Sequence, residues 1–475
     1  MMGRAMLPPS WQQTPLDEAL DAIVGGGTPP KNKPEYFRGE IPLMTVKDMR
    51  ERRPSGTGFN ITREGLENSS AKLIPANTIV IATRMGLGKI VRAPFETAIN
   101  QDLKALFPKT GINTSYLEFW LLSIAGKLES MGTGTTVKGL RLEKLKSLEF
   151  PVAPSNEQHR IVEKIETLFA HIDKGEEALR EVQKLLKRYR QSILKAAVTG
   201  ELTRDWREAN QHKLEPASDL FARILETRRE KWQGRGKYKE PKNPELVDLP
   251  EMPEEWTWAG PEQLSKSAPN SMCIGPFGSN LKVSDYKNLG VPLIFVRHIR
   301  SQDFKGQNTK YVADEKAQEL SSHHVYPGDL LITKMGDPPG DVAIYPGDAP
   351  IGVITADCIR LSIADHDLSE SYLELAISSP LVQAQIKRIS KGVAQQKVTL
   401  ANFKRIGLPL PPYAEQREIS ARVADAMAKI TDLECSCETE LTRSTSLRQS
   451  ILKSAFTGQL VPQDPNDQAA SELLA

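Results

Sequence analysis

The chain has 475 residues, of which 39% are hydrophobic, 26% charged and 6% aromatic, a composition that excludes collagen-like, wholly disordered and disulfide-scaffold proteins. Sixty-two basic and sixty acidic residues give a net charge of +2, so binding to nucleic acid would need local basic surfaces. No apolar run approaches the ~18–20 residues that cross a bilayer, and the start lacks the apolar core of a signal peptide. These features predict a cytoplasmic protein with no membrane contact.

In chain order, the sequence predicts two similar series of elements. Short β-rich runs such as 78–83 and 329–333 are separated by glycine and proline turns and followed by helices around 116–125 and 372–377. A long helix ends each series, and a connector with a charged helix over 217–232 joins the two. The predicted domains are a first variable domain 1–150, a first repeated helix 151–203, a connector 204–249, a second variable domain 250–407, a second repeated helix 408–461 and a tail 462–475.

An internal repeat supports this division. The stretch that begins at Phe150 matches the one that begins at Leu408, and Glu157 to Gly200 aligns without a gap with residues 258 positions later. Helix packing is sensitive to length, which explains a gap-free repeat. The preceding domains correspond only loosely, which indicates one fold that carries two different surfaces.

Apolar residues in the first long helix recur at alternating spacings of four and three, the pattern of a coiled-coil seam. The predicted seam of the first helix consists of Ile161, Ile165, Leu168, Ile172, Leu179, Val182, Leu186, Tyr189 and Ile193. The corresponding apolar positions of the second helix are Ile419, Val423, Ile430, Leu433, Leu447 and Ile451.

The two seams are expected to pair, because an isolated helix would leave its apolar stripe in water. Leu433 corresponds to Gly175, the break in the first seam, and is expected to fill that level. Some forty residues at ~1.5 Å each make a rod of roughly 60 Å. The predicted fold class is α+β: two α/β domains separated by two long antiparallel coiled-coil helices, with a pseudo-two-fold, circular internal repeat.

The sequence offers no convincing catalytic or metal site. The four cysteines form no C-x-x-C pair, and no histidine spacing suits zinc. Asp337-Pro-Pro-Gly340 is similar to an adenine methyltransferase motif but has glycine where an aromatic would stack on a flipped base. Leu410-Pro-Pro-Tyr413 has the aromatic but no amide or carboxylate, and Gly86 to Lys89 lacks the spacing of a phosphate loop. These segments are interpreted as turns.

Two variable domains that alternate with two repeated helices, with Pro411-Pro-x-x-Glu415-Gln before the second helix and S-I-L-K-x-A-x-T-G at both helix ends, strongly resemble the specificity subunit of type I restriction-modification systems. The resemblance spans nearly the whole chain. It implies that the variable domains are target recognition domains, that the chain itself is not catalytic, and that it binds a bipartite, asymmetric site in double-stranded DNA as part of a defence against phage.

The same resemblance implies partners and cofactors. Two methyltransferase subunits would use S-adenosylmethionine to methylate adenine N6, and restriction subunits would use ATP and Mg²⁺, so the chain itself would hold no cofactor. Two alternatives stay open at this point: a self-contained DNA-modifying enzyme, against which the missing motifs argue, and a purely structural coiled-coil scaffold. A scaffold would not need two large, divergent domains.

Candidate DNA contacts follow from chemistry, because base edges are read by paired donors and acceptors and phosphates by basic and hydroxyl groups. The stretches 184–190 and 223–242 are locally basic, and could equally be solvated helix faces. Corresponding loops of the two variable domains supply the candidates Lys47, Arg84, Lys89, Asn100, Gln101, Thr135 and Lys138 in the first, and Arg297, His298, Lys334, Gln395, Gln396 and Lys397 in the second.

Overall fold

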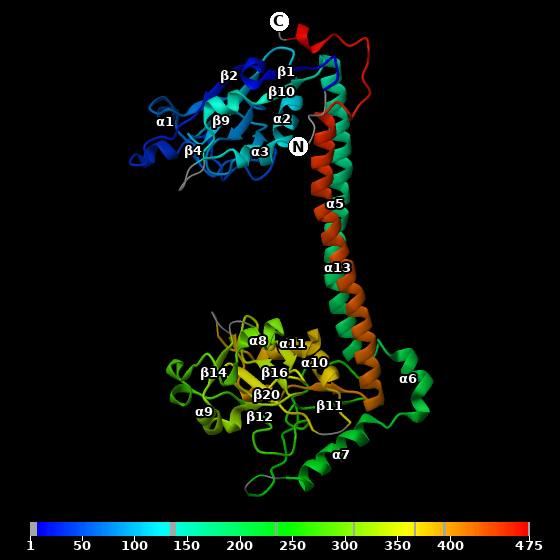
Figure 1. Ribbon diagram of the computed structural model, residues 1–475. Helices are drawn as coiled ribbons and strands as arrows, with labels where there is room; N and C mark the ends of the chain where they lie inside the picture. The colour runs from blue at the N-terminus through cyan, green and yellow to red at the C-terminus, as the bar shows by residue number, and fades with distance from the viewer. Residues whose placement is uncertain are drawn as a thin grey trace. The chain divides into compact units, whose positions relative to one another are not determined.

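The computed structural model describes residues 7–133, 139–232, 234, 236–306, 309–364, 367–392 and 396–473. The chain divides into two compact units (Figure 1). Unit 1 comprises Met1–Arg180 and Cys437–Ala475, and unit 2 comprises Glu181–Ser436. Each unit therefore contains one variable domain together with part of each long helix, α5 (Ser155–Val198) and α13 (Tyr413–Ala455).

Two four-stranded sheets form the variable domain of unit 1. One has the order β2-β9-β6-β7 and the other the order β4-β3-β8-β5, in which β3 and β8 run parallel, while β1 and β10 form an antiparallel pair. The strands are β1 Gln12–Pro15, β2 Leu20–Gly25, β3 Ile41–Met44, β4 Asn60–Ile61, β5 Lys72–Ile74, β6 Ile79–Ala82, β7 Ile90–Arg92, β8 Thr97–Ile99, β9 Leu103–Pro108 and β10 Glu149–Val152. The helices are η1 Leu16–Ala19, η2 Pro34–Phe37, α1 Arg63–Glu67, α2 Thr114–Ser123, α3 Ala125–Ser130, α4 Leu142–Lys146 and η7 Ala470–Glu472.

The variable domain of unit 2 repeats this strand order. Its sheets have the orders β12-β20-β16-β18 and β14-β13-β19-β15, with β13 parallel to β19, and β11 pairs with β22. A further pair, β17 with β21, joins two loops. The strands are β11 Thr257–Ala259, β12 Met272–Ile274, β13 Val291–Ile294, β14 Lys310–Val312, β15 His324–Val325, β16 Leu330–Thr333, β17 Met335–Gly336, β18 Val342–Ile344, β19 Gly352–Ile354, β20 Cys358–Leu361, β21 Gln396–Lys397 and β22 Leu408–Leu410.

The helices of unit 2 cover its sheets and form the connector. They are α6 Arg204–Asn210, η3 Gln211–Lys213, α7 Ala217–Glu230, η4 Gly278–Asn280, η5 Val283–Asp285, α8 Val296–Ser301, α9 Asp314–Glu319, η6 Ser321–His323, α10 Glu370–Ser378, α11 Pro380–Ile389 and α12 Leu400–Phe403. The matching topology of the two units confirms the predicted α+β class with an internal repeat. In the described part of the chain, no helix is long and apolar enough to cross a membrane.

The repeated Glu-Gln pair attaches each long helix to its variable domain. The Trp11 indole donates to Glu157 Oε2 at 2.9 Å, and the Trp256 indole donates to Glu415 Oε2 at 2.8 Å. The glutamine that follows accepts a hydrogen bond from the backbone N–H at the start of α2 or α10, as Gln158 does from Asn113 at 2.8 Å. All four of these helix side chains are fully buried, so the sequence motif encodes a rigid joint.

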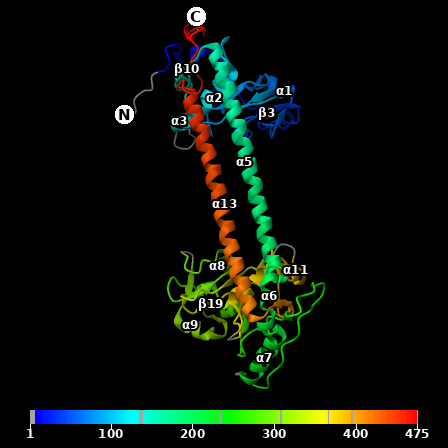
Figure 2. The same ribbon diagram turned by 90° about the vertical axis from the view of Figure 1, so that its right-hand side faces the viewer.

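The long helices run antiparallel, because the start of α5 packs with the end of α13 in unit 1, and the end of α5 packs with the start of α13 in unit 2 (Figure 2). Two ion pairs fix their register. Arg448 donates to Glu176 Oε1 at 3.1 Å in unit 1, and Arg190 donates to Glu434 Oε2 at 3.0 Å in unit 2. The two pairs are related by the 258-residue shift of the repeat, so equivalent residues pair within each unit.

The seam differs from the prediction at four positions. Val182, Tyr189, Leu433 and Leu447 are exposed, Tyr189 by 58% and Leu433 by 51%. The other predicted positions of α5 are buried or half-buried, but Gln183 and Arg190 take the places expected for Val182 and Tyr189, so that polar side chains alternate with apolar ones. From Ile165 to Ala197, the stripe that faces the other helix consists of Ile165, Phe169, Ile172, Glu176, Leu179, Gln183, Leu186, Arg190, Ile193 and Ala197, all buried or half-buried. The charged residues Glu176 and Arg190 are tolerated at these positions because each pairs with an opposite charge on the other helix.

The expectation that Leu433 fills the level of Gly175 is also wrong. A Cβ placed on Gly175 would meet nothing within 4 Å, so this glycine leaves no gap in the seam. Arg448 reaches the same turn of α5, where it donates to Asp173 at 2.7 Å as well as to Glu176. In an antiparallel pair, positions that correspond by sequence do not face each other, which explains the error.

Candidate DNA interface

Two loops meet in each variable domain, and both carry candidate DNA-binding residues. In unit 1, the loop after β6 forms an isolated bridge between Arg84 and Gly139, and Leu140 N–H donates to Thr83 O at 2.8 Å. In unit 2, the corresponding loops form the strand pair β17–β21, and Val398 N–H donates to Lys334 O at 3.0 Å. The fold therefore brings together, in each unit, residues that are more than fifty positions apart in the sequence.

The basic residues of unit 1 lie close to the first of these loops. Arg84 is exposed and lies 3.9 Å from Asp102, too far for a strong ion pair. Lys89 is exposed, with its Nζ 3.5 Å from the Val46 carbonyl oxygen. Lys47 and Gln101 line a cavity of about 650 Å³. These four candidates are placed where they can contact a ligand.

Asn100 corrects the prediction. Although it lines the same cavity, its side chain is 6% exposed and is held by Asp102, since Asn100 Nδ2 donates to Asp102 Oδ2 at 3.1 Å and Oδ1 accepts from the Asp102 N–H at 3.2 Å. Both ends of the amide thus take part in shaping the turn, and the side chain is nearly enclosed. The candidates Thr135, Lys138 and Gln395 lie outside the described residues.

A buried charge cluster holds the segment that carries Lys47. Glu118 on α2 is fully buried and accepts from Arg53 at 2.5 and 2.8 Å and from Arg52 at 3.1 and 3.2 Å. Burial alone would raise the pKa of Glu118, but the hydrogen bond from Arg53 and the nearby charges of Arg52 and Arg92 outweigh it, and the pKa is lowered. The segment is therefore anchored to α2 as an ionised cluster.

In unit 2, the candidates gather around an aromatic side chain. Lys334 Nζ lies 4.6 Å from the ring centroid of Phe277, which is 53% exposed, and burial lowers the pKa of Lys334. Lys397 is exposed beside it on β21, and Gln396 Oε1 is buried without a hydrogen-bond partner. Arg297 stacks over Phe295 at 4.2 Å. Phe277 was not among the predicted contacts, because an aromatic ring offers no hydrogen bond to a base edge.

His298 is a second correction. It is 4% exposed, and its Nδ1 accepts a hydrogen bond from the Phe295 N–H at 3.2 Å. Burial, together with the neighbouring charge of Arg297, lowers its pKa, which favours the neutral ring. His298 therefore shapes the start of α8, and little of its side chain is open to a ligand.

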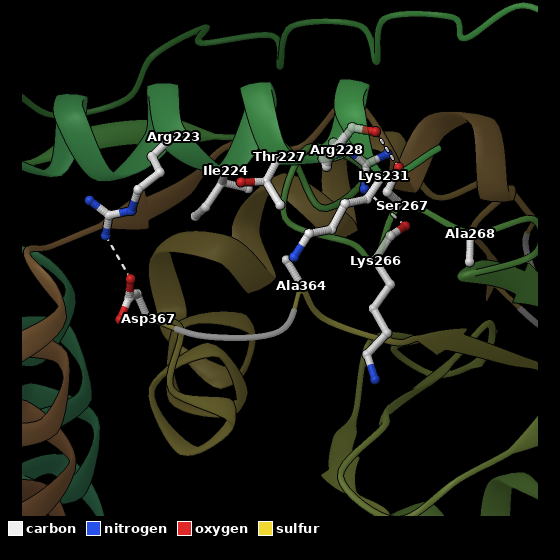
Figure 3. A pocket seen from close by; sticks show the side chains of 10 residues that line it. All are labelled: Arg223, Ile224, Thr227, Arg228, Lys231, Lys266, Ser267, Ala268, Ala364 and Asp367. Atoms are coloured by element: carbon white, nitrogen blue, oxygen red, sulfur yellow. Dashed lines mark hydrogen bonds and ion pairs between the residues drawn. The ribbon is translucent and has the colours of Figure 1, made fainter. Parts of the chain in front are cut away.

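A separate cavity of about 370 Å³ lies beneath the connector helix α7 of unit 2 (Figure 3). Its two arginines attach α7 to the rest of the unit. Arg228 is buried and donates to the backbone and hydroxyl oxygens of Ser265, while Arg223 donates to Asp367 at 2.6 Å (Figure 3). In the described residues, no group of three or more His, Cys, Asp or Glu side chains could hold a metal ion.

The chain is similar in sequence to a family of known proteins. The family model described as the type I restriction modification DNA specificity domain matches residues 8–183 and 294–443. The specificity subunit of the EcoBI type I restriction enzyme of Escherichia coli is 28% identical over 351 residues, which cover 73% of this chain and 66% of that protein. The EcoKI specificity subunit of E. coli K12 is 23% identical, and the match covers 97% of this chain and 92% of that protein.

Solved structures share the fold. A chain from a study of complex assembly and conformational transition of the type I R-M system superposes with a TM-score of 0.65 and 16% identity, covering 96% of this chain and 100% of that one. The HsdS subunit from Thermoanaerobacter tengcongensis gives a TM-score of 0.56 and 17% identity, covering 96% of this chain and 99% of that one.

Proposed function

Because the chain belongs to the family of type I restriction-modification DNA specificity subunits, we propose that each of its variable domains reads one half of a bipartite, asymmetric DNA site. The observation that carries the proposal is the pair of equivalent loop junctions with unequal side chains. Unit 1 presents an exposed Arg84 that lies 3.9 Å from Asp102, whereas unit 2 presents Lys334 over the ring of Phe277. The same fold with different groups at the same place suits two different half-sites.

The exposed cations around each junction are suited to phosphates, which position a protein on DNA without specifying sequence. In unit 1 these are Lys47, Arg84 and Lys89, and in unit 2 Lys397. Replacing one phosphate contact should weaken binding to all sequences and lower the dependence on salt, whereas replacing a base contact should relax one position at a cost of ~1–3 kcal/mol.

The exposed apolar residues of α5 support a docking role for the helices. Val182, Leu185 and Tyr189 are 39%, 51% and 58% exposed and follow each other at spacings of three and four, so they lie on one helix face. Such a stripe is unusual on a monomer and suits a protein partner. We assign it to the methyltransferase subunits, which would bind S-adenosylmethionine, and we assign ATP and Mg²⁺ to the restriction subunits.

Domain exchange tests this function. Residues 1–150 are replaced with the corresponding domain of another specificity subunit, and methylated adenines are mapped in cells that also express the methyltransferase subunits. The expected result is a new sequence in one half-site and an unchanged sequence in the other. The matched control exchanges residues 250–407 and should change only the other half-site. A change in both halves after either exchange would contradict independent reading.

A further inference from the structure

Two large apolar side chains lie exposed at the cavity of unit 1 that contains the candidate base-reading residues. Met85 is 60% exposed and Phe59 is 53% exposed, and both line the cavity together with Lys47 and Gln101. Apolar side chains are expensive to leave in water, so their presence in this place calls for a reason other than folding.

The backbone conformation of Met85 is also unfavourable for a methionine. Met85 has a φ of +51°, in the left-handed region that disfavours side chains with a Cβ, and Gly86 and Gly88 beside it have φ values of +101° and +85°. The turn is fixed on both sides, since the N–H groups of Thr83 and Arg84 donate to the Asp102 carbonyl before it, and the Ala82 N–H donates to the Lys89 carbonyl after it. Glycine or asparagine would serve the turn better, and an exposed methionine gains little from packing. A strained residue of this kind indicates a functional contact.

Gln101 supplies the polar half of the site. The Thr28 hydroxyl lies 2.7 Å from Gln101 Oε1 and donates to it, which orients the amide so that Nε2 is left to donate elsewhere. In the major groove, thymine presents an acceptor, O4, next to an apolar C5-methyl group. A donor beside an apolar wall is complementary to that edge.

We propose that Met85 and Phe59 contact the C5-methyl group of a thymine in the half-site read by unit 1, while Gln101 donates a hydrogen bond to O4 of the same base. The inference rests on the proposed DNA-reading function and adds a base identity to it. In unit 2 the equivalent Met335 lies in β17, is only partly exposed and has no positive φ, so the feature belongs to unit 1.

Deoxyuridine substitution tests the proposal, because uracil keeps O4 and lacks only the methyl group. Each thymine of the methylated site is replaced in turn, and binding by the complex of this chain with its methyltransferase subunits is measured. At one thymine of the first half-site, removal of the methyl group should lower the affinity of the complex for the DNA about fourfold. A complex that carries Met85→Ala and Phe59→Ala should bind the thymine and uracil sites equally well.

Two further variants complete the test. Met85→Gly suits the left-handed backbone, so it should fold normally and still lose discrimination, which separates recognition from folding. Met335→Ala in unit 2 should leave the discrimination unchanged. The proposal is overturned if the first half-site contains no thymine, or if methyl discrimination persists in the double variant. Binding that ignores a scrambled first half-site would instead overturn the proposed DNA-reading function.

Discussion

The ion pair between Arg207 and Glu415 offers a direct test of how the connector is fixed to the second long helix. Glu415 is fully buried and accepts from Arg207 at 2.6 Å, from the Thr203 hydroxyl at 2.7 Å and from the Trp256 indole at 2.8 Å. Arg207→Ala removes the only cation in this set and leaves a buried carboxylate with two neutral donors. Removing one partner of such a pair costs ~3–5 kcal/mol.

The free energy of unfolding of unit 2, followed by urea or thermal denaturation of the full chain, should fall by that amount. For a unit of this size, the midpoint temperature should drop on the order of 10 °C. Arg223→Ala is the matched control, since its pairs with Glu215 and Asp367 are close to half exposed and should cost less than about 1 kcal/mol. Arg207→Leu with Glu415→Gln should recover most of the loss, because no charge stays buried. A loss below about 1 kcal/mol for Arg207→Ala, or no recovery in the double variant, would refute the reasoning.

Three further outcomes are expected. Inserting seven residues into both α5 and α13 keeps the seam in phase and lengthens each helix by ~10 Å. The preferred gap between half-sites should therefore grow by about three base pairs. An unchanged gap in an assembled, active complex would contradict this. A fragment of residues 1–235 should form a homodimer in which Arg190 pairs with Glu176 of the partner subunit, as Arg190 pairs with Glu434 in the intact chain. Together with methyltransferase subunits, this dimer should methylate a palindromic site. A monomer in sedimentation equilibrium would argue against the prediction. Burial raises the pKa of Glu157 above 4.5, so its contribution to stability is present at acid pH and is lost as the pH rises through the raised value. Glu157→Gln should therefore gain stability relative to the native chain as the pH rises from 4.5, and parallel pH profiles would contradict the assignment.

The homodimer prediction changes once the helix register is known. Sequence comparison alone suggests a weaker dimer, because Gly175 would lack the leucine of the second helix. In the structure Gly175 lies outside the seam, and α5 offers Leu179 and Leu186 where α13 has Cys437 and Ser444. The dimer seam is therefore more apolar than the intramolecular one, and we expect the dimer to be at least as stable.

Local patterns of residues account for several features of this protein. The gap-free repeat, the extents of α5 and α13, and the Glu-Gln motif at their starts are all readable from residue order, because helix length and capping are local properties. The α+β class and the division into two similar domains follow from the same repeat. So does the family resemblance, which the comparison with known proteins confirms.

Which side chains face the other long helix or the candidate DNA surface depends on how the folded chain packs. Hydrophobicity alone would place Val182 in the seam rather than its neighbour Gln183. In the structure Gln183 is half-buried and Val182 is exposed, because Glu176 and Arg190 pair with residues of the other helix and set its rotation. Asn100 and His298 are chemically suited to reading bases but are buried against their own backbone turns. Burial and register arise from contacts between residues distant in the sequence, so no local pattern can fix them.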